Sequence, residues 1–247
     1  MPSPDIPKII HQTWKDNRLP PEMAALRDGW RRRHPHWSYR FYTDADCRDV
    51  VRRHFPDWTG IYDAYRRPIQ RVDLFRYLIV YHHGGLYADM DMACFRPVDA
   101  LLGGSTCVLS VEALLTRAYQ RELGYRKPLQ VANCIFAAAP GHPFFSQVLE
   151  KVRHHARTQA VSDRDVEDAT GPRMLTRVYF SLDENVRSQI RLLPQIHLMA
   201  PTCYPDRFPF NRKVYARHHC AGTWKTPSGP ISLNRRWIER NRLPRFW

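Results

Sequence analysis

Two aspartates two residues apart, Asp89 and Asp91, have the clearest capacity for chemistry in this chain. They follow a glycine pair in the segment GGLYADMDM, where polar and apolar residues alternate. An alternation of period two predicts a strand with Tyr87, Asp89 and Asp91 on one face. Like charges so placed repel each other, and a hard divalent cation between them removes the repulsion. The pattern therefore predicts a site for Mg²⁺ or Mn²⁺; the alternative is a solvated turn with two inert aspartates.

The segment before the glycine pair is expected to be a helix that carries a second polar group. Pro68 suits the first turn of a helix, apolar residues recur at helical spacing, and the glycines end it. On this helix Asp73, Arg76 and Tyr77 share one face. The aspartate and arginine form either a simple intrahelical ion pair, worth about 0.3 kcal/mol, or a polar surface directed at a ligand beside the two acids.

The order of these motifs, R-x-D-x-x-R-Y followed by G-G-x-Y-x-D-x-D, resembles glycosyltransferase family 32. That family includes yeast mannosyltransferases and bacterial polysaccharide biosynthesis enzymes, and the glucosylating clostridial toxins are more distant relatives. The resemblance implies that Asp89 and Asp91 hold Mn²⁺ or Mg²⁺ and the diphosphate of a UDP- or GDP-linked sugar donor. It also implies that Asp73 and Arg76 contact the donor sugar and that Tyr87 lines the nucleotide site.

Further segments extend the resemblance in patches from Ile6 to Trp224. The opening, IPKIIHQTW, implies that Trp14 stacks on the nucleotide base, with a core tryptophan as the alternative. A segment ending in PGHPF assigns Asn133 to the active-site face; alternatively, it is a buried asparagine bonded by the backbone. The ending YARHHCAGTW implies that His218 is a third metal ligand and that Trp224 helps to close the site over the sugar. The alternative there is a pair of surface histidines.

Two other acidic positions have competing interpretations. Glu112 follows a predicted buried strand, Cys107–Val111, and ligands often bind at the carboxyl ends of strands in α/β sheets. It is therefore either a candidate nucleophile or a cap of the next segment. A second D-x-D, formed by Asp44 and Asp46, precedes a helical pattern and is interpreted as an N-terminal cap.

Helical and strand patterns alternate along the chain, which favours an α/β sheet with helices on both faces. Strands are predicted near Ile6–Ile10, Trp37–Phe41, Cys107–Val111 and Val131–Ala138, and helices at 21–33, 44–55, 68–83, 143–155 and 172–182. A turn is expected at 56–60 and a loop at 158–168, and His34 and His36 are expected at the surface. The family resemblance implies the GT-A nucleotide-sugar-binding architecture with a mostly parallel sheet. One domain is expected over residues 1–247, with a basic C-terminal segment from about 225.

The chain carries a formal net charge of +14, with 38 lysines and arginines against 24 acidic residues. Such a charge attracts anionic partners, either phosphorylated substrates, anionic lipid or nucleic acid. Nucleic acid is not the expected partner, because neither a recognition helix nor a zinc-finger spacing is visible. A nucleic-acid-binding protein or metal nuclease is nevertheless the second hypothesis, and a toxin-like transferase that modifies proteins is the third.

Composition also bears on location. No apolar run reaches the length of about 18 residues that a membrane-spanning helix needs, and the start lacks the pattern of a secretory signal. Six cysteines without a C-x-x-C pair are typical of free thiols in a reducing compartment. We therefore expect a cytoplasmic protein, peripheral at the inner face of a membrane. The residues expected to contact anionic lipid are Arg235, Arg236, Trp237, Arg240, Arg242, Arg245 and Trp247.

The primary functional hypothesis is a metal-dependent, retaining glycosyltransferase. It would move a hexose from a nucleoside diphosphate sugar to a hydroxyl of a glycan, a lipid-linked saccharide or a lipid. Because no carboxylate stands at a position that marks a glycosyl nucleophile, a front-face mechanism is favoured. In that mechanism the departing phosphate accepts the proton of the incoming hydroxyl.

Overall fold

The computed structural model describes residues 5–156, 160, 162–200 and 212–222. Its centre is a seven-stranded sheet in the order β2-β1-β3-β7-β5-β6, with β8 also paired to β5. These strands are β1 (Ile9–Thr13), β2 (Ser38–Tyr42), β3 (Gly85–Ala88), β5 (Cys107–Leu114), β6 (Leu129–Val131), β7 (Ile135–Ala138) and β8 (Ile190–Leu193). A separate two-stranded sheet joins β4 (Met92–Cys94) to β9 (Ala216–His218).

The main sheet is mostly parallel, as predicted. Strand β1 pairs in parallel with both β2 and β3, and β5 pairs in parallel with β8. Strand β7 lies antiparallel between β3 and β5, and β6 is antiparallel to β5. Consequently β1, β2, β3, β5 and β8 run in one direction, and their carboxyl ends lie at one edge of the sheet.

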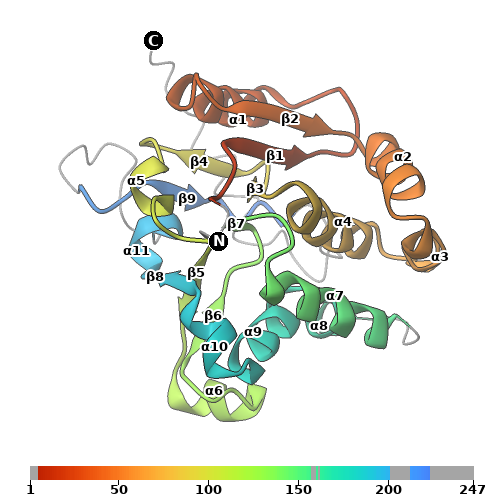
Figure 1. The fold of residues 1–247 in the computed structure, drawn as a ribbon, viewed down its shortest axis with the longest axis vertical. Helices are drawn as coiled ribbons and strands as arrows, with labels where there is room; N and C mark the ends of the chain where they lie inside the picture. The colour runs from red at the N-terminus through yellow and green to blue at the C-terminus, as the bar shows by residue number, and fades with distance from the viewer. Residues whose placement is uncertain (1–4, 157–159, 161, 201–211, 223–247) are drawn as a thin grey trace, which may run out of the picture.

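Helices cover both faces of this sheet, which confirms the predicted layers. The helices are α1 (Pro21–Arg33), α2 (Asp44–His54), α3 (Pro56–Ala64), α4 (Pro68–His83), α5 (Asp99–Leu102), α6 (Arg117–Leu123), α7 (Pro143–His155), α8 (Asp163–Ala169), α9 (Pro172–Ser181), α10 (Glu184–Ser188) and α11 (Gln195–Leu198). In Figure 1, α4 and α7 lie on one side of the sheet, and α5 and α11 lie on the other. The strand alternation divides the core accordingly: Tyr87 and Phe136 face α4 and α7, whereas Leu86 and Ile135 face the opposite cluster.

Helix α4 is the element that positions the site. It is buried along most of its length, including the polar residues Asp73 and Arg76. It ends at Gly84, which has a φ of +66°, and a Cβ there would lie 2.7 Å from Pro7 and Pro140 side-chain atoms. Only glycine fits this close approach, so the chain passes directly from α4 into β3.

Several local predictions need correction. Residues 56–60 do not form a turn, because Pro56 begins α3 at a position where its missing N–H is harmless. The expected loop at 158–168 contains α8, which starts with a reciprocal cap between Ser162 and Asp165. The strand predicted over 131–138 is interrupted between β6 and β7, since its two parts pair differently. The first strand lies a few residues later than predicted.

His34 is buried, not at the surface. Its Nδ1 donates to the Trp30 carbonyl at 2.9 Å, and its Nε2 accepts from the Val98 N–H at 3.0 Å. Burial lowers its pKa, which keeps the ring neutral in this fixed tautomer. His36 is exposed as expected.

The second D-x-D is a helix cap, as the sequence indicates. Thr43 is the N-cap of α2; its hydroxyl accepts from the Asp46 N–H at 3.1 Å. The Asp46 carboxylate in turn accepts from the Thr43 N–H at 2.9 Å. Asp46 thus caps α2, and both Asp44 and Asp46 lie in its first turn, where a negative charge stabilises a helix.

The cysteines within the described residues are all free thiols, buried except for Cys220, which agrees with the sequence interpretation. Within the same residues, no helix has the combination of length and hydrophobicity that crossing a bilayer requires.

Candidate metal and donor-sugar site

The two acids of the motif lie on a turn between β3 and β4, not on one face of a single strand. The turn is closed by a hydrogen bond from the Met92 N–H to the Asp89 carbonyl, 3.1 Å long. The Asp89 N–H donates to the Cys134 carbonyl at 2.8 Å, and the Gln12 amide donates to the Asp89 carbonyl at 3.1 Å. The turn is therefore fixed from β1 and from the β6–β7 link, at the carboxyl edge of the sheet.

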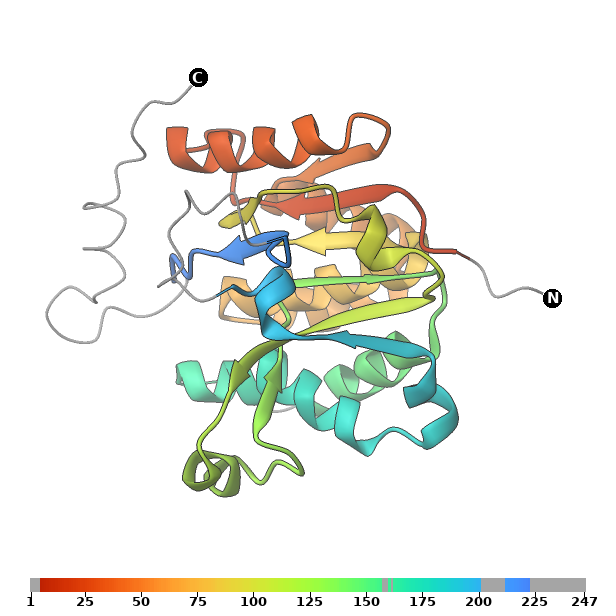
Figure 2. The same cartoon turned by 90° about the vertical axis from the view of Figure 1, so that its left-hand side faces the viewer.

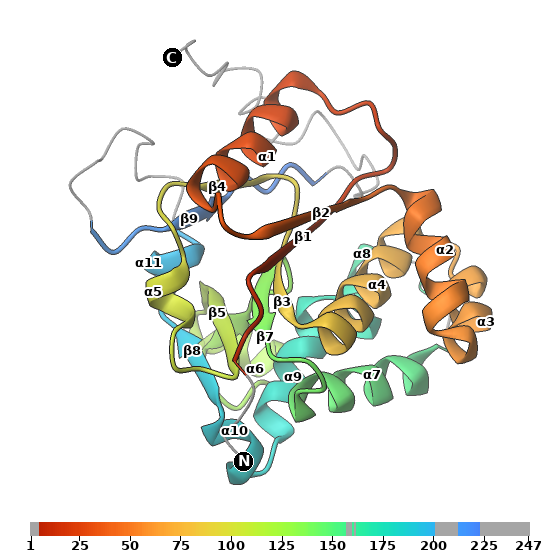
Figure 3. The ribbon, with the colours of Figure 1, turned by 45° about the horizontal axis from the view of Figure 1, so that its top comes forward.

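A histidine from a distant part of the chain lies beside this turn. The antiparallel pairing of β4 with β9 sets His218 opposite Met92 (Figure 3). His218 Nε2 lies 3.1 Å from Asp91 Oδ1. One ligand atom from each of Asp89, Asp91 and His218 lies within 4.8 Å of the others, and this is the one such group within the described residues. Two carboxylates and an imidazole suit a Mn²⁺-class ion, so the residues present fit a metal.

The electrostatics of the pair also favour a cation. Burial raises the pKa of Asp91, but His218 and the Ala221 N–H lower it more, to about 2. The Ala221 N–H donates to Asp91 Oδ2 at 2.8 Å. Burial raises the pKa of Asp89, Arg76 opposes this rise, and Asp91 adds to it. Because Asp91 raises the pKa of Asp89, a positive ion bound between the two carboxylates would offset their repulsion.

Arg76 connects this metal group to a buried polar network. Its Nη2 lies 3.1 Å from Asp89 Oδ1 and 3.5 Å from Asp73 Oδ1. Its Nη1 donates to the Asn133 carbonyl at 2.7 Å, and the guanidinium lies 4.8 Å from the centre of the Tyr87 ring. The Arg76 side chain is only 2% exposed. Arg76 therefore does not form the simple intrahelical ion pair that the sequence allowed, because it is buried and contacts the carboxylates of both Asp73 and Asp89.

Asp73 is held from elements far apart in the sequence. Its Oδ1 accepts from the Asn133 side-chain amide at 3.1 Å, and its Oδ2 accepts from the Thr170 hydroxyl at 2.8 Å. Burial raises the pKa of Asp73 to about 7, although Arg76 and Thr170 act in the opposite direction. The Tyr77 hydroxyl donates to the Thr170 carbonyl at 2.8 Å and so fixes the same segment.

Tyr87 and Trp14 lie next to this network at the end of β1. The Tyr87 hydroxyl donates to Asp89 Oδ1 at 2.8 Å and lies 3.0 Å from the Thr13 hydroxyl. Trp14 directly follows β1, and its N–H donates to the Tyr42 carbonyl at 2.9 Å. Its indole N–H is buried without a hydrogen-bond partner within the described residues. A buried polar atom without a partner is uncommon in folded proteins.

Glu112 is not one of the three residues that could hold the metal. It occupies a β-bulge in β5, so it lies within the strand and not just past its end, as the sequence had suggested. Its carboxylate accepts from the Gln130 amide at 2.7 Å, and its carbonyl accepts from Gln195. Trp224 and the basic segment from about 225 lie outside the described residues.

Sequence reasoning missed some residues that the structure adds to the site. Gln12 bonds the D-x-D turn, Thr170 bonds Asp73, and the Ala221 N–H bonds Asp91. Gln12 falls in the IPKIIHQTW segment, whose resemblance to the family was a usable signal. Nothing in the local sequence marks the backbone N–H of Ala221.

The fold and this arrangement define a class. A mostly parallel α/β sheet with a D-x-D turn at its carboxyl edge is a GT-A nucleotide-sugar-binding fold. A family model described as "Glycosyltransferase sugar-binding region containing DXD motif" matches residues 20–108. The solved structure of PaToxG Glycosyltransferase has the same fold, with a TM-score of 0.51 and 16% identity, over 75% of this chain and 74% of that one.

Curated relatives agree with this match. The mannosyl phosphorylinositol ceramide synthase CSH1 of Saccharomyces cerevisiae is 31% identical over 174 residues, 70% of this chain and 42% of its own length. Inositol phosphoceramide mannosyltransferase 1 of Schizosaccharomyces pombe is 28% identical over 239 residues, 96% of this chain and 66% of its own length. The chain belongs to the DXD-motif glycosyltransferases of family 32. It spans less than two thirds of the length of these relatives.

Proposed function

We propose that this chain is a metal-dependent, retaining glycosyltransferase that moves a hexose from a nucleoside diphosphate sugar to an acceptor hydroxyl. The observation that carries the proposal is the group formed by Asp89, Asp91 and His218, with the buried Arg76 beside it. The names of the relatives favour mannose as the hexose and a phosphorylated sphingolipid headgroup as the acceptor.

Each residue of the site has a proposed role. Asp89, Asp91 and His218 hold Mn²⁺ or Mg²⁺, which when bound supplies Lewis-acid stabilisation of the leaving diphosphate. Arg76 adds a fixed positive charge that is already oriented by two carboxylates, and Asp73 contacts the donor sugar.

The remaining site residues position the donor. Trp14 and Tyr87 line the nucleotide side of the site, and the stacking of an aromatic ring on the base contributes about 1–3 kcal/mol. Asn133 orients Asp73 through its side-chain amide. Trp224 is assigned to the sugar by resemblance alone, because it lies outside the described residues.

A front-face reaction is the mechanism we favour. The bond between the sugar and the leaving phosphate breaks as the acceptor oxygen approaches the same face, and the phosphate accepts the acceptor's proton. A double displacement would need a carboxylate nucleophile. Glu112, the weak candidate from the sequence, is already engaged by Gln130.

Replacing Glu112 by Gln distinguishes the two mechanisms. We expect donor turnover to stay within about tenfold of the wild-type value, since the charge of this carboxylate is not needed in a front-face reaction. The measurement is kcat/KM for nucleotide-sugar hydrolysis. A loss of several orders of magnitude, with a glycosylated Glu112 detected by mass spectrometry in the native protein, would establish double displacement instead.

Replacing His218 by Ala should raise the Mn²⁺ concentration needed for half-maximal turnover by about 10- to 100-fold, because an imidazole ligand is lost. His219→Ala is the matched control, and it should leave the metal requirement unchanged. The measurement is a Mn²⁺ titration of donor hydrolysis. If only His219→Ala raised the Mn²⁺ requirement, His219 would be the ligand. If neither substitution changed the requirement, the two aspartates alone would hold the ion.

The proposal as a whole is tested by a hydrolysis screen with UDP- and GDP-linked sugars, each with Mn²⁺ and with EDTA. Metal-dependent release of the nucleotide from at least one donor is expected. Family membership favours this activity over a metal nuclease or a nucleic-acid-binding protein. That alternative would require nucleic-acid binding with a steep salt dependence and no donor hydrolysis. Cytoplasmic placement at a membrane stays a prediction.

A further inference from the structure

The part of the chain between β5 and β6 forms a projection from the body of the protein. Past the bulge at Glu112, β5 continues to Leu114, where the chain leaves the sheet; it folds through α6 and returns at Leu129, where β6 begins. We call residues 112–130 the α6 excursion. Figure 2 shows it in yellow-green, extending below the remaining layers. The α6 excursion has no part in the metal group or the Arg76 network described above.

Topology sets the direction of this projection. Strands β3 and β5 are both antiparallel to β7, so they run in the same direction. Strand β1 is parallel to β3 and therefore runs in that direction too. The excursion therefore leaves from the carboxyl edge of the sheet. That edge also carries Trp14, which follows β1, and the D-x-D turn, which follows β3. A flat surface touching the excursion at this edge would face the donor site.

The surface of the α6 excursion combines exposed apolar and basic side chains. Leu114 is 73% exposed and Tyr119 is 39% exposed, and they are the large hydrophobic residues that the described part of the chain leaves exposed. The exposed basic residues of the excursion are Arg117, Arg121, Arg126 and Lys127. No ion pair joins any of these four to another described residue, whereas the acidic Glu122 is paired with Arg164 at 3.1 Å.

The arrangement of these charges is unfavourable without a partner. Arg117 and Arg121 are four residues apart on α6 and so lie on one face of the helix. Like charges at this spacing repel each other and destabilise an isolated helix. An anionic surface opposite them attracts both charges and so stabilises the arrangement. The exposed Leu114 provides the apolar contact that a charged surface alone lacks.

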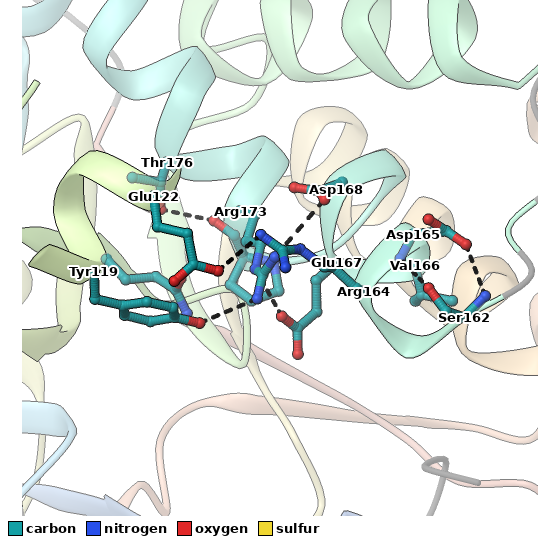
Figure 4. A network of polar contacts seen from close by, with 12 residues as sticks. Tyr119, Glu122, Ser162, Arg164, Asp165, Val166, Glu167, Asp168, Arg173 and Thr176 are labelled. Carbon is teal, nitrogen blue, oxygen red and sulfur yellow. Dashed lines mark hydrogen bonds and ion pairs between the residues drawn. The ribbon is translucent and has the colours of Figure 1, made fainter. Parts of the chain in front are cut away.

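The α6 excursion is held against α8 and α9 by polar contacts. Figure 4 shows the contacts that join it to α8 and α9. The Tyr119 hydroxyl accepts from Arg173 Nη2 at 3.1 Å, and Arg173 is itself bound by Glu167 at 2.9 Å. At the start of α6, the Thr116 hydroxyl accepts from the Tyr119 N–H. A fixed surface can orient the whole molecule on whatever it contacts.

We propose that the α6 excursion is a membrane-contact surface that holds the donor site against an anionic bilayer. Leu114 enters the interfacial layer, and the four basic side chains contact anionic headgroups. This inference rests on the proposed function to the extent that the bilayer is where the lipid acceptor lies. The contact itself is a property of the described surface and is measured without donor or acceptor.

The test is co-sedimentation of the full chain with vesicles of phosphatidylcholine alone and of phosphatidylcholine with phosphatidylserine. The native protein is expected to bind the anionic vesicles and to lose that binding at high salt. Arg117→Gln/Arg121→Gln should weaken binding to the anionic vesicles at least about tenfold. Leu114→Ser should weaken binding to them as well, without changing its salt dependence.

The matched control is Arg52→Gln/Arg53→Gln at the far end of α2. These arginines are exposed, their removal changes the net charge equally, and α2 runs away from the carboxyl edge on which it begins. This control should bind the vesicles within about twofold of the native protein. Equal losses for both double variants would mean that only net charge matters, and no loss for the α6 variants would overturn the proposal.

Two further readouts complete the design. Hydrolysis of a soluble donor by water should be unchanged in the α6 variants, which shows that they fold. If all proteins lack hydrolysis but the vesicle results are as expected, the proposed function fails and the membrane contact stands. If Leu114→Ser instead converts a dimer to a monomer and leaves vesicle binding intact, the surface binds a second copy and the membrane proposal is overturned.

Discussion

Asp91→Asn should reduce donor turnover at least about a thousandfold while the protein stays folded. The native carboxylate is ionised, because its pKa is held at about 2, and it lies 3.1 Å from His218. The amide keeps the shape and one acceptor oxygen but removes the charge that a divalent cation needs. The measurements are kcat/KM with Mn²⁺ and the far-UV circular dichroism spectrum.

A readout independent of activity accompanies this prediction. If Mn²⁺ binds the folded protein at the proposed site, it should raise the melting temperature of the native chain, whereas Asp91→Asn should show little rise. The matched control is Asp44→Asn, in the D-x-D that caps α2, which should behave as the native protein in both assays. Full native turnover in EDTA, or near-normal turnover of Asp91→Asn, would contradict the metal assignment.

Arg76→Ala should lose both activity and stability. The substitution leaves the buried Asp73 and the partly exposed Asp89 without their shared cation, and breaking a buried ion pair by removing one partner costs about 3–5 kcal/mol. For a protein of this size that corresponds to a fall of about 10 °C in melting temperature. Donor turnover should fall by orders of magnitude, because the fixed positive charge next to Asp89 is gone.

Burial changes what the sequence alone suggested for this residue. If Arg76 formed only an exposed ion pair on the helix, its substitution would leave the melting temperature of the protein almost unchanged. The Arg76 side chain is instead only 2% exposed. Arg48→Ala is the matched control, since Arg48 forms a two-point ion pair with Asp63 at the surface. It should shift the melting temperature little.

Arg76→Lys separates the two roles of Arg76. Lysine keeps the positive charge and should recover part of the lost stability, but it lacks the fork that reaches Asp89 and the Asn133 carbonyl together. Turnover should therefore stay low. A native melting temperature for Arg76→Ala would contradict the structural role of Arg76. Native turnover for this variant would contradict its functional role.

In the segment from Pro68 to Met92, local features of the sequence determined the ends of α4 and made both polar motifs recognisable. The proline and the glycines fix the ends of α4 because their effects act through their own backbone angles and N–H groups. The D-x-D and the R-x-D-x-x-R-Y pattern were visible for the same reason, since their members are close in the chain. The α/β class and the layering of helices on both faces followed from the alternation of elements.

The tertiary structure decided which distant residues meet, because that depends on strand pairing and burial that no local pattern encodes. The pairing of β4 with β9 brings His218 to Asp91, and the interruption between β6 and β7 places Asn133 against Asp73. Burial turned the Asp73–Arg76 pair into part of a wider network. The antiparallel placement of β7 likewise set β5 parallel to β3, so the exposed apolar and basic side chains of the α6 excursion leave the sheet at the edge that carries the D-x-D turn.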